Sequence, residues 1–222
     1  AFAAADEVGV LLHPEGGIWT DKWMSEGDAI GWGKPVDDFV ERELRAIQDA
    51  YGNHPSMVSL AIGNELGNSN FEVLGEMIRE AKAYDPRYLY SASSARWVSS
   101  GDDFLLAASI PEHGSKNAMR ILSREKLYPR TDWDYESLYG VAPLPVIAHE
   151  IGQWPVYPLW DEFFQPFDGS LRPWNYTRHQ RKAVKNDTLC FQREYHAASA
   201  KLSRLIYKEE VESFLRTPSC AG

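Results

Sequence analysis

Continuous apolar runs, each only a few residues long, constrain the fold of this chain more than any other feature. Leu60–Ile62 and Val146–Ala148 contain no polar residue, so neither shows the alternation of a half-exposed strand. Strands of this kind are typical of parallel sheets covered by helices on both faces. Between the runs the sequence changes to helical spacing. This alternation of strand and helix predicts an α/β fold with a parallel sheet.

Helical spacing is clearest in three segments. The first runs from Pro35 to Gly52, where the glycine suits a C-terminal cap. The second starts at Asn70, a good N-cap residue, and ends before Asp85-Pro86. A final helix is expected from about Thr188 into the charged stretch near the C-terminus. We therefore expect helices over most of these three segments.

The strand candidates are residues 8–12, 57–63, 88–92, 104–110 and 144–148. Residues 111–143 are irregular and polar, and 155–185 are predicted to form a long loop rich in proline and aromatic residues. Repeats, low-complexity segments and interdomain linkers are not recognisable. The sequence thus predicts a single domain over residues 1–222.

Composition limits the classes of function. The net charge of −9 argues against a nucleic-acid surface, which needs a clustered basic patch. The sequence also lacks an apolar run of the ~18 residues that a membrane-spanning helix requires. The two cysteines, Cys190 in a probable helix and Cys220 in a probable tail, have no metal-ligand spacing around them. We expect two unpaired thiols, no membrane partner and no nucleic-acid partner.

Two strand candidates end on a glutamate. Asn64-Glu65 follows the first apolar run, and His149-Glu150 follows the second. In α/β barrels, side chains at the C-terminal ends of the strands point into the mouth of the active site. Retaining glycosidases need two carboxylates about 5 Å apart, one as nucleophile and one as proton donor, with different pKa values. Although most of the 32 acidic residues are expected at the surface, this pair predicts a glycosidase.

The segments around the two glutamates also resemble a known family. NHPSM followed by GNEL is similar to the acid/base segment of glycoside hydrolase family 2, the β-galactosidase and β-glucuronidase group of clan A, and HEIGQWPVYP is similar to a nucleophile segment. The resemblance implies a (β/α)8 barrel with Glu65 as acid/base, Glu150 as nucleophile and Asn64 as donor to the sugar 2-hydroxyl. It implies a carbohydrate substrate and no cofactor. A periplasmic or secreted location would fit the family.

The resemblance covers only part of a barrel. A complete barrel has about 250 residues, and this chain would supply about strands 3 to 7 with their flanking helices. We expect a larger parent chain to supply strands 1, 2 and 8 and the N-terminal β-sandwich domains. Activity is expected of that complete protein and is not required of the isolated fragment. The family's tyrosine that holds the nucleophile has no clear counterpart, and His113 is the nearest polar substitute.

Further candidates flank the expected strand ends. His13, Glu15 and His149 are candidates for contacts with sugar hydroxyls, and Trp19 and Trp154 for stacking against a sugar ring. Ordinary packing or solvent contact is the alternative for each of them.

Other reaction classes fit the sequence less well. HEIGQW lacks the second histidine of a zinc-binding HExxH motif, and a serine-hydrolase GxSxG elbow does not occur. The alternative to an enzyme is a non-catalytic carbohydrate-binding or scaffolding piece on the same fold.

Overall fold

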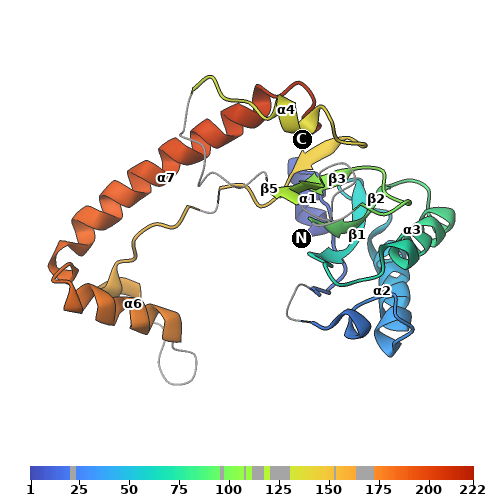
Figure 1. The fold of residues 1–222 in the computed structure, drawn as a ribbon, viewed down its shortest axis with the longest axis horizontal. Coiled ribbons are helices and arrows are strands. Elements are labelled where there is room, and N and C mark those ends of the chain that lie inside the picture. The colour runs from blue at the N-terminus through green and yellow to red at the C-terminus, as the bar shows by residue number, and fades with distance from the viewer. Residues whose placement is uncertain are drawn as a thin grey trace. The chain divides into compact units, whose positions relative to one another are not determined.

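The computed structural model describes residues 1–20, 24–95, 98–107, 109–111, 118–120, 131–152, 154–163 and 173–222 (Figure 1). His113 lies outside these residues. The chain divides into two compact units. The first contains the described residues of 1–128, 132–151 and 213–222, and the second those of 129–131 and 152–212.

A parallel sheet of four strands organises the first unit. Its order is β1 (Ser59–Asn64), β2 (Leu89–Ser94), β3 (Leu105–Ala107) and β6 (Val146–Ala148), and all neighbours are parallel. Single parallel bridges extend this order at both edges, from residues 12–19 to β1 and from Cys220 to β6. The predicted α/β fold with a parallel sheet is therefore confirmed, while Cys220 joins the sheet where the sequence predicted a tail.

Two amphipathic helices cover one side of β1 and β2 (Figure 1). Helix α2 (Pro35–Tyr51) ends at Gly52, as predicted, and α3 (Phe71–Tyr84) begins after Asn70, whose side chain accepts the Glu72 backbone N–H at 3.2 Å. The apolar faces of both helices pack on β1 and β2 in one core. Its buried members include Leu44, Leu60, Ile62, Leu74, Ile78 and Tyr90.

The opposite face of the same strands carries small side chains. Ser59 and Ala61 of β1 and Ser91 and Ser93 of β2 are all buried, although none is large. Because residues alternate between the faces of a strand, the large side chains face α2 and α3 and the small ones face the other way. The side chains on this second face are therefore small.

The N-terminal prediction was wrong in detail. Residues 8–12 do not form a strand, because helix α1 (Phe2–Val8) extends to Val8 and ends at Gly9 in the left-handed conformation. The run beside β1 is residues 12–19, which touches the sheet only at isolated bridges. It lies so close that a side chain at Gly16 would collide with the carbonyl of Ile62.

Smaller elements complete the first unit. They are η1 (Glu26–Asp28), the antiparallel pair β4 (Ser109–Pro111) and β5 (Ala118–Arg120), and α4 (Glu136–Tyr139). A second core lies beside β6 and contains Leu105, Tyr135, Tyr139, Val146 and Phe214. Tyr135 and Phe214 stack with their ring centres 4.8 Å apart.

The second unit is helical. It contains α5 (Trp160–Phe163), α6 (Trp174–Lys185), η4 (Leu189–Phe191) and most of α7 (Gln192–Leu215). Helix α7 matches the predicted final helix, but α5 and α6 lie where the sequence predicted only a loop. Both cysteines are unpaired, as predicted. Among the described helices, none has the length and apolar character needed to cross a membrane.

Candidate active site

The carboxyl ends of the parallel strands bring several predicted residues together in the first unit. Trp19 forms a parallel bridge with Asn64, which is in turn opposite Ser94 at the end of β2. Glu65 directly follows this row, and its backbone N–H donates to the Ser94 carbonyl at 2.8 Å. The ladder thus continues one residue beyond β1 and holds the backbone of Glu65 against β2.

Trp19 contacts the carboxylate of Glu65. Its indole N–H donates to Oε2 of Glu65 at 2.9 Å, and half of the Trp19 side chain remains exposed, at 51%. The sequence predicted Trp19 as a stacking surface for sugar. In the structure the indole also fixes one orientation of the Glu65 carboxylate.

His13 and Glu15 lie beside the same strands. His13 Nδ1 is 2.7 Å from the Ser59 hydroxyl, and its Nε2 is 3.9 Å from the Glu15 carboxylate. Ser94 donates a hydrogen bond to that carboxylate. Phe104 packs edge-on against the His13 ring, with the ring centres 5.7 Å apart. His13 and Glu15 therefore belong to one polar cluster with two serines that the sequence analysis missed.

Three buried polar atoms of predicted site residues lack a hydrogen-bond partner within the described residues. They are Nε2 of His13, Oδ1 of Asn64 and Nδ1 of His149. Buried polar groups are nearly always paired, so unpaired ones are expected where water or a ligand binds. All three belong to residues that the sequence predicted as sugar contacts.

Both glutamates have unusual backbone conformations. Glu65 has a φ of 50° and Glu150 a φ of 51°, and Ala95, the residue after β2, has a φ of 59°. Non-glycine residues rarely adopt these values, and such strained residues cluster at active sites. The chain therefore turns sharply after β1, β2 and β6, and two of these three turns present a glutamate.

The strain at Ala95 predicts an unusual response to glycine. Left-handed backbone costs a residue with a Cβ roughly 1 to 2 kcal/mol, which Ala95→Gly relieves. Ala92→Gly, at a similarly buried alanine within β2, relieves nothing and loses about 1 kcal/mol. We expect the free energy of unfolding of Ala95→Gly to exceed that of Ala92→Gly by at least about 1 kcal/mol in urea unfolding. Equal losses of unfolding free energy in the two variants would show that the Ala95 backbone is not strained.

His13 is the described site residue with a clearly shifted pKa. Burial, together with the smaller effect of the nearby charge of His149, lowers the pKa of His13 from 6.5 to about 4. Between these pH values the unfolded chain binds a proton that the folded chain does not. The contribution of His13 to the free energy of unfolding is therefore fully present above about pH 6.5, and it is lost as the pH drops towards about 4.

Replacing His13 tests this linkage. The shift corresponds to about 3 kcal/mol of unfolding free energy lost between about pH 6.5 and about pH 4. We expect His13→Asn to remove that part of the acid sensitivity in urea unfolding at several pH values. His179→Asn, at an exposed histidine of α6, is the matched control. Identical pH slopes for the wild type and His13→Asn would exclude the shift.

Trp154, the other residue predicted to stack on a sugar ring, lies in the second unit. Its indole N–H donates at 3.1 Å to Oε2 of Glu210, and the Gly152 backbone N–H donates at 3.1 Å to Oε1. Glu210 is only 4% exposed. One buried carboxylate of α7 thus fixes the chain just after the Glu150 segment. Glu210 was not predicted to have a role, because it lies in a charged run of the sequence.

Neither a metal site nor a known relative indicates the function of this chain. Among the described residues, no group of three or more His, Cys, Asp or Glu side chains is arranged to hold a metal ion. Comparison with protein-family models and with curated proteins finds no match for this chain.

Proposed function

We propose that this chain carries the catalytic residues of a retaining exo-β-glycosidase of the family 2 type, on part of a (β/α)8 barrel. The observation that carries the proposal is the placement of two glutamates. Glu65 and Glu150 each follow a strand of one parallel sheet at its carboxyl end, and both have left-handed backbone. The carboxyl ends of parallel strands are where barrel enzymes place their catalytic groups.

The proposal requires the sheet to be curved. Adjacent strands lie about 4.8 Å apart, so β1 and β6, with two strands between them, would be about 14 Å apart in a flat sheet. A retaining pair of carboxyl groups is only about 5 to 5.5 Å apart.

The electrostatic interaction between His13 and His149 supports such curvature. His13 comes from the segment beyond β1 and His149 from the end of β6, so they belong to opposite edges of the four-stranded sheet. The charge of His149 nevertheless contributes to the lowered pKa of His13. Interaction across the sheet is expected when the strands wrap around a common interior, as in a barrel.

The proposed reaction is a double displacement. Glu150 attacks the anomeric carbon while Glu65 donates its proton to the leaving oxygen, which breaks the glycosidic bond and forms a glycosyl ester on Glu150. Glu65 then takes a proton from water, whose oxygen attacks the anomeric carbon and releases Glu150. Glu150 is exposed, and Glu65 is the less exposed of the two.

The surrounding groups have supporting roles in this scheme. Trp19 holds the Glu65 carboxylate by the indole hydrogen bond, and the Asn64 side chain contacts the sugar 2-hydroxyl. The unpaired atoms of His13 and His149 receive other hydroxyl groups. The scheme requires no cofactor.

Hydrolysis of aryl β-glycosides by the complete protein, with and without Glu150→Gln, tests the proposal. A glycosidase loses turnover in the variant. A non-catalytic carbohydrate-binding protein shows no turnover in either form and retains its affinity for sugar, which would overturn the proposal.

A further inference from the structure

The charge of helix α6 is opposite to that of the chain. The chain has a net charge of −9, yet α6 contains Arg178, Arg181, Lys182 and Lys185 and no Asp or Glu. All four cations are exposed, and none forms an ion pair with any residue that the structure describes. Two other exposed cations of this unit are paired, Arg193 with Glu162 at 3.4 Å and Lys208 with Glu212 at 2.5 Å. A cluster of unpaired cations on an acidic protein attracts anionic ligands.

The cations share one face of the helix with an exposed aromatic ring. Counting from Trp174, they occupy positions i+4, i+7, i+8 and i+11, which lie within an arc of about 100° on an α-helix. Ala183, the buried residue of α6, lies on the opposite side, so the charged face points away from the packed side. Trp174 itself is 74% exposed. An indole ring and four cations therefore form a continuous stripe, which we call the basic face.

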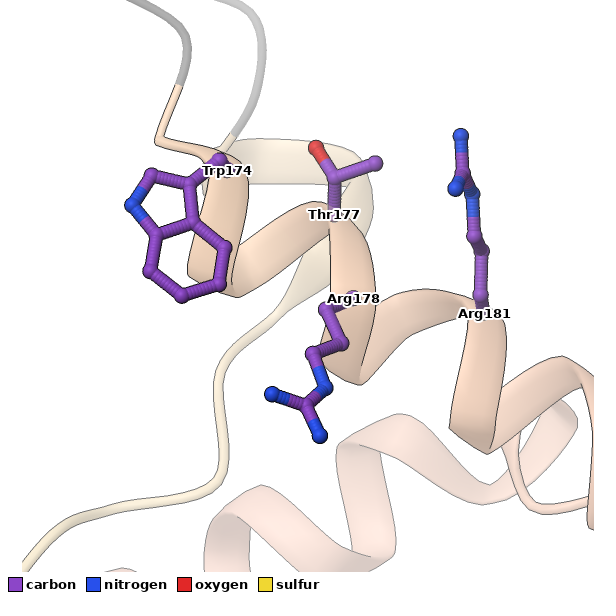
Figure 2. Close-up of a pocket in the computed structure, with 4 residues that line it drawn as sticks. All are labelled: Trp174, Thr177, Arg178 and Arg181. Carbon is purple, nitrogen blue, oxygen red and sulfur yellow. The ribbon is translucent and has the colours of Figure 1, made fainter.

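A surface hollow of about 550 Å³ lies along the basic face. It is lined by Trp174, Thr177, Arg178 and Arg181 (Figure 2). In Figure 2, Thr177 and Arg181 extend to the same side of the helix and Arg178 extends away from them. The two guanidinium groups are thus separated along the hollow and present two positions for anionic groups.

A second hollow, of about 590 Å³, lies next to the basic face in the same unit. Its lining includes Tyr157, Trp160, Tyr176 and His179, and it also includes Lys182 of the basic face. Trp160 packs edge-on against Tyr157 and Tyr176, with ring centres 5.9 Å and 6.0 Å away. Both hollows therefore combine aromatic side chains with cationic ones.

We propose that the basic face of α6 is an accessory binding site for a polyuronate, a polysaccharide whose sugars carry carboxylates. Guanidinium groups bind carboxylates through two parallel hydrogen bonds, and an indole face packs on the apolar face of a pyranose ring. The choice of a sugar among the polyanions rests on the proposed glycosidase function. The binding itself requires no catalysis.

Two other polyanionic partners fit the basic face less well. The face is about 16 Å long, and even a single DNA-binding module buries about 600 to 1,000 Å². A membrane-surface helix needs a broad apolar face to enter the lipid, whereas the side of α6 opposite the cations contains the buried Ala183.

The test measures binding of polygalacturonate to the complete protein by affinity electrophoresis, with neutral galactan as the uncharged comparison. We expect retardation by polygalacturonate that weakens with added salt, and a Kd about tenfold higher for the Arg178→Gln/Arg181→Gln double variant. The Lys201→Gln/Arg204→Gln double variant removes the same charge from exposed positions of α7 and is expected to bind like the wild type. Thermal unfolding checks that both variants fold.

Each remaining outcome is decisive. Absence of binding, or equal weakening by both double variants, overturns the accessory site. So does equally tight binding of duplex DNA or of phosphatidylserine vesicles, because the surface would then not select a sugar. Aryl β-glycoside hydrolysis is measured on the same samples. Hydrolysis without polyuronate binding refutes this inference alone, and binding without hydrolysis refutes only the proposed glycosidase.

Discussion

Glu150→Gln is expected to lower kcat for aryl β-glycosides by about a thousandfold or more, equivalent to about 4 kcal/mol of lost transition-state stabilisation. The amide nearly matches the carboxylate in size but cannot form the glycosyl ester. Loss of the nucleophile removes the whole double-displacement route, so every leaving group is affected. Glu76→Gln, at an exposed carboxylate of α3 whose side chain is 68% exposed, is expected to retain wild-type turnover.

The stereochemistry of azide rescue makes this test sharper. Glu150→Gly leaves space for azide to attack the anomeric carbon from the nucleophile's side, so the glycosyl azide is expected to have inverted configuration. Glycine also suits the backbone at this position, where φ is 51°. NMR of the product gives the configuration. A loss of less than about tenfold in Glu150→Gln would exclude Glu150 as the nucleophile.

Glu65→Gln is expected to slow hydrolysis by about 10²- to 10⁴-fold when the leaving group is an alcohol or a sugar. These leaving oxygens need a proton as the glycosidic bond breaks, and Gln cannot supply it. Dinitrophenolate leaves without protonation, so kcat/KM for a dinitrophenyl glycoside is expected to fall far less. The ratio of the two losses is the diagnostic quantity.

Trp19 provides a control for the role assigned to Glu65. Trp19→Phe removes the hydrogen-bond donor but keeps the Glu65 carboxylate. The variant is therefore expected to lose a similar factor in kcat/KM for both leaving groups. Glu65→Gly with azide is expected to give a glycosyl azide of retained configuration. If Glu65→Gln slowed both substrates equally, Glu65 would not be the general acid.

Local signals account for the parts of the fold that were predicted correctly. Helix α2 begins at a proline, and α3 follows an asparagine whose side chain caps it. Each of these signals acts within a few residues, so the chain alone is sufficient to read it. The apolar run of β1 was also recognised, because a strand buried on both faces leaves no polar residue in its middle.

The incorrect predictions concern segments whose structure depends on distant contacts. Residues 8–12 are apolar, but short apolar runs fit a helix end as well as a strand. Helix α6 was hidden by the prolines and aromatic residues of the segment before it. Its single buried position, Ala183, gives almost no hydrophobic period.

The candidate site shows the same division. Polar residues at the ends of apolar runs could be proposed from the sequence, and the structure places Asn64, Glu65 and Glu150 at strand ends. Ser59 and Ser94 were missed, because a serine within a strand gives no signal of its own. Their roles depend on the register that sets the 12–19 segment against β1, and this register is decided by tertiary packing.

The boundaries of the two units have a consequence for the modular construction of this protein. Apart from residues 129–131, the second unit is one continuous stretch that leaves the first unit after Ile151 and returns to it at Ser213. Ile151 and Phe214, at the two crossing points, pack in the same apolar cluster. The helical unit is thus an insertion whose two ends share one attachment point, an arrangement that lets such a module be lengthened, exchanged or lost while the sheet keeps its own core.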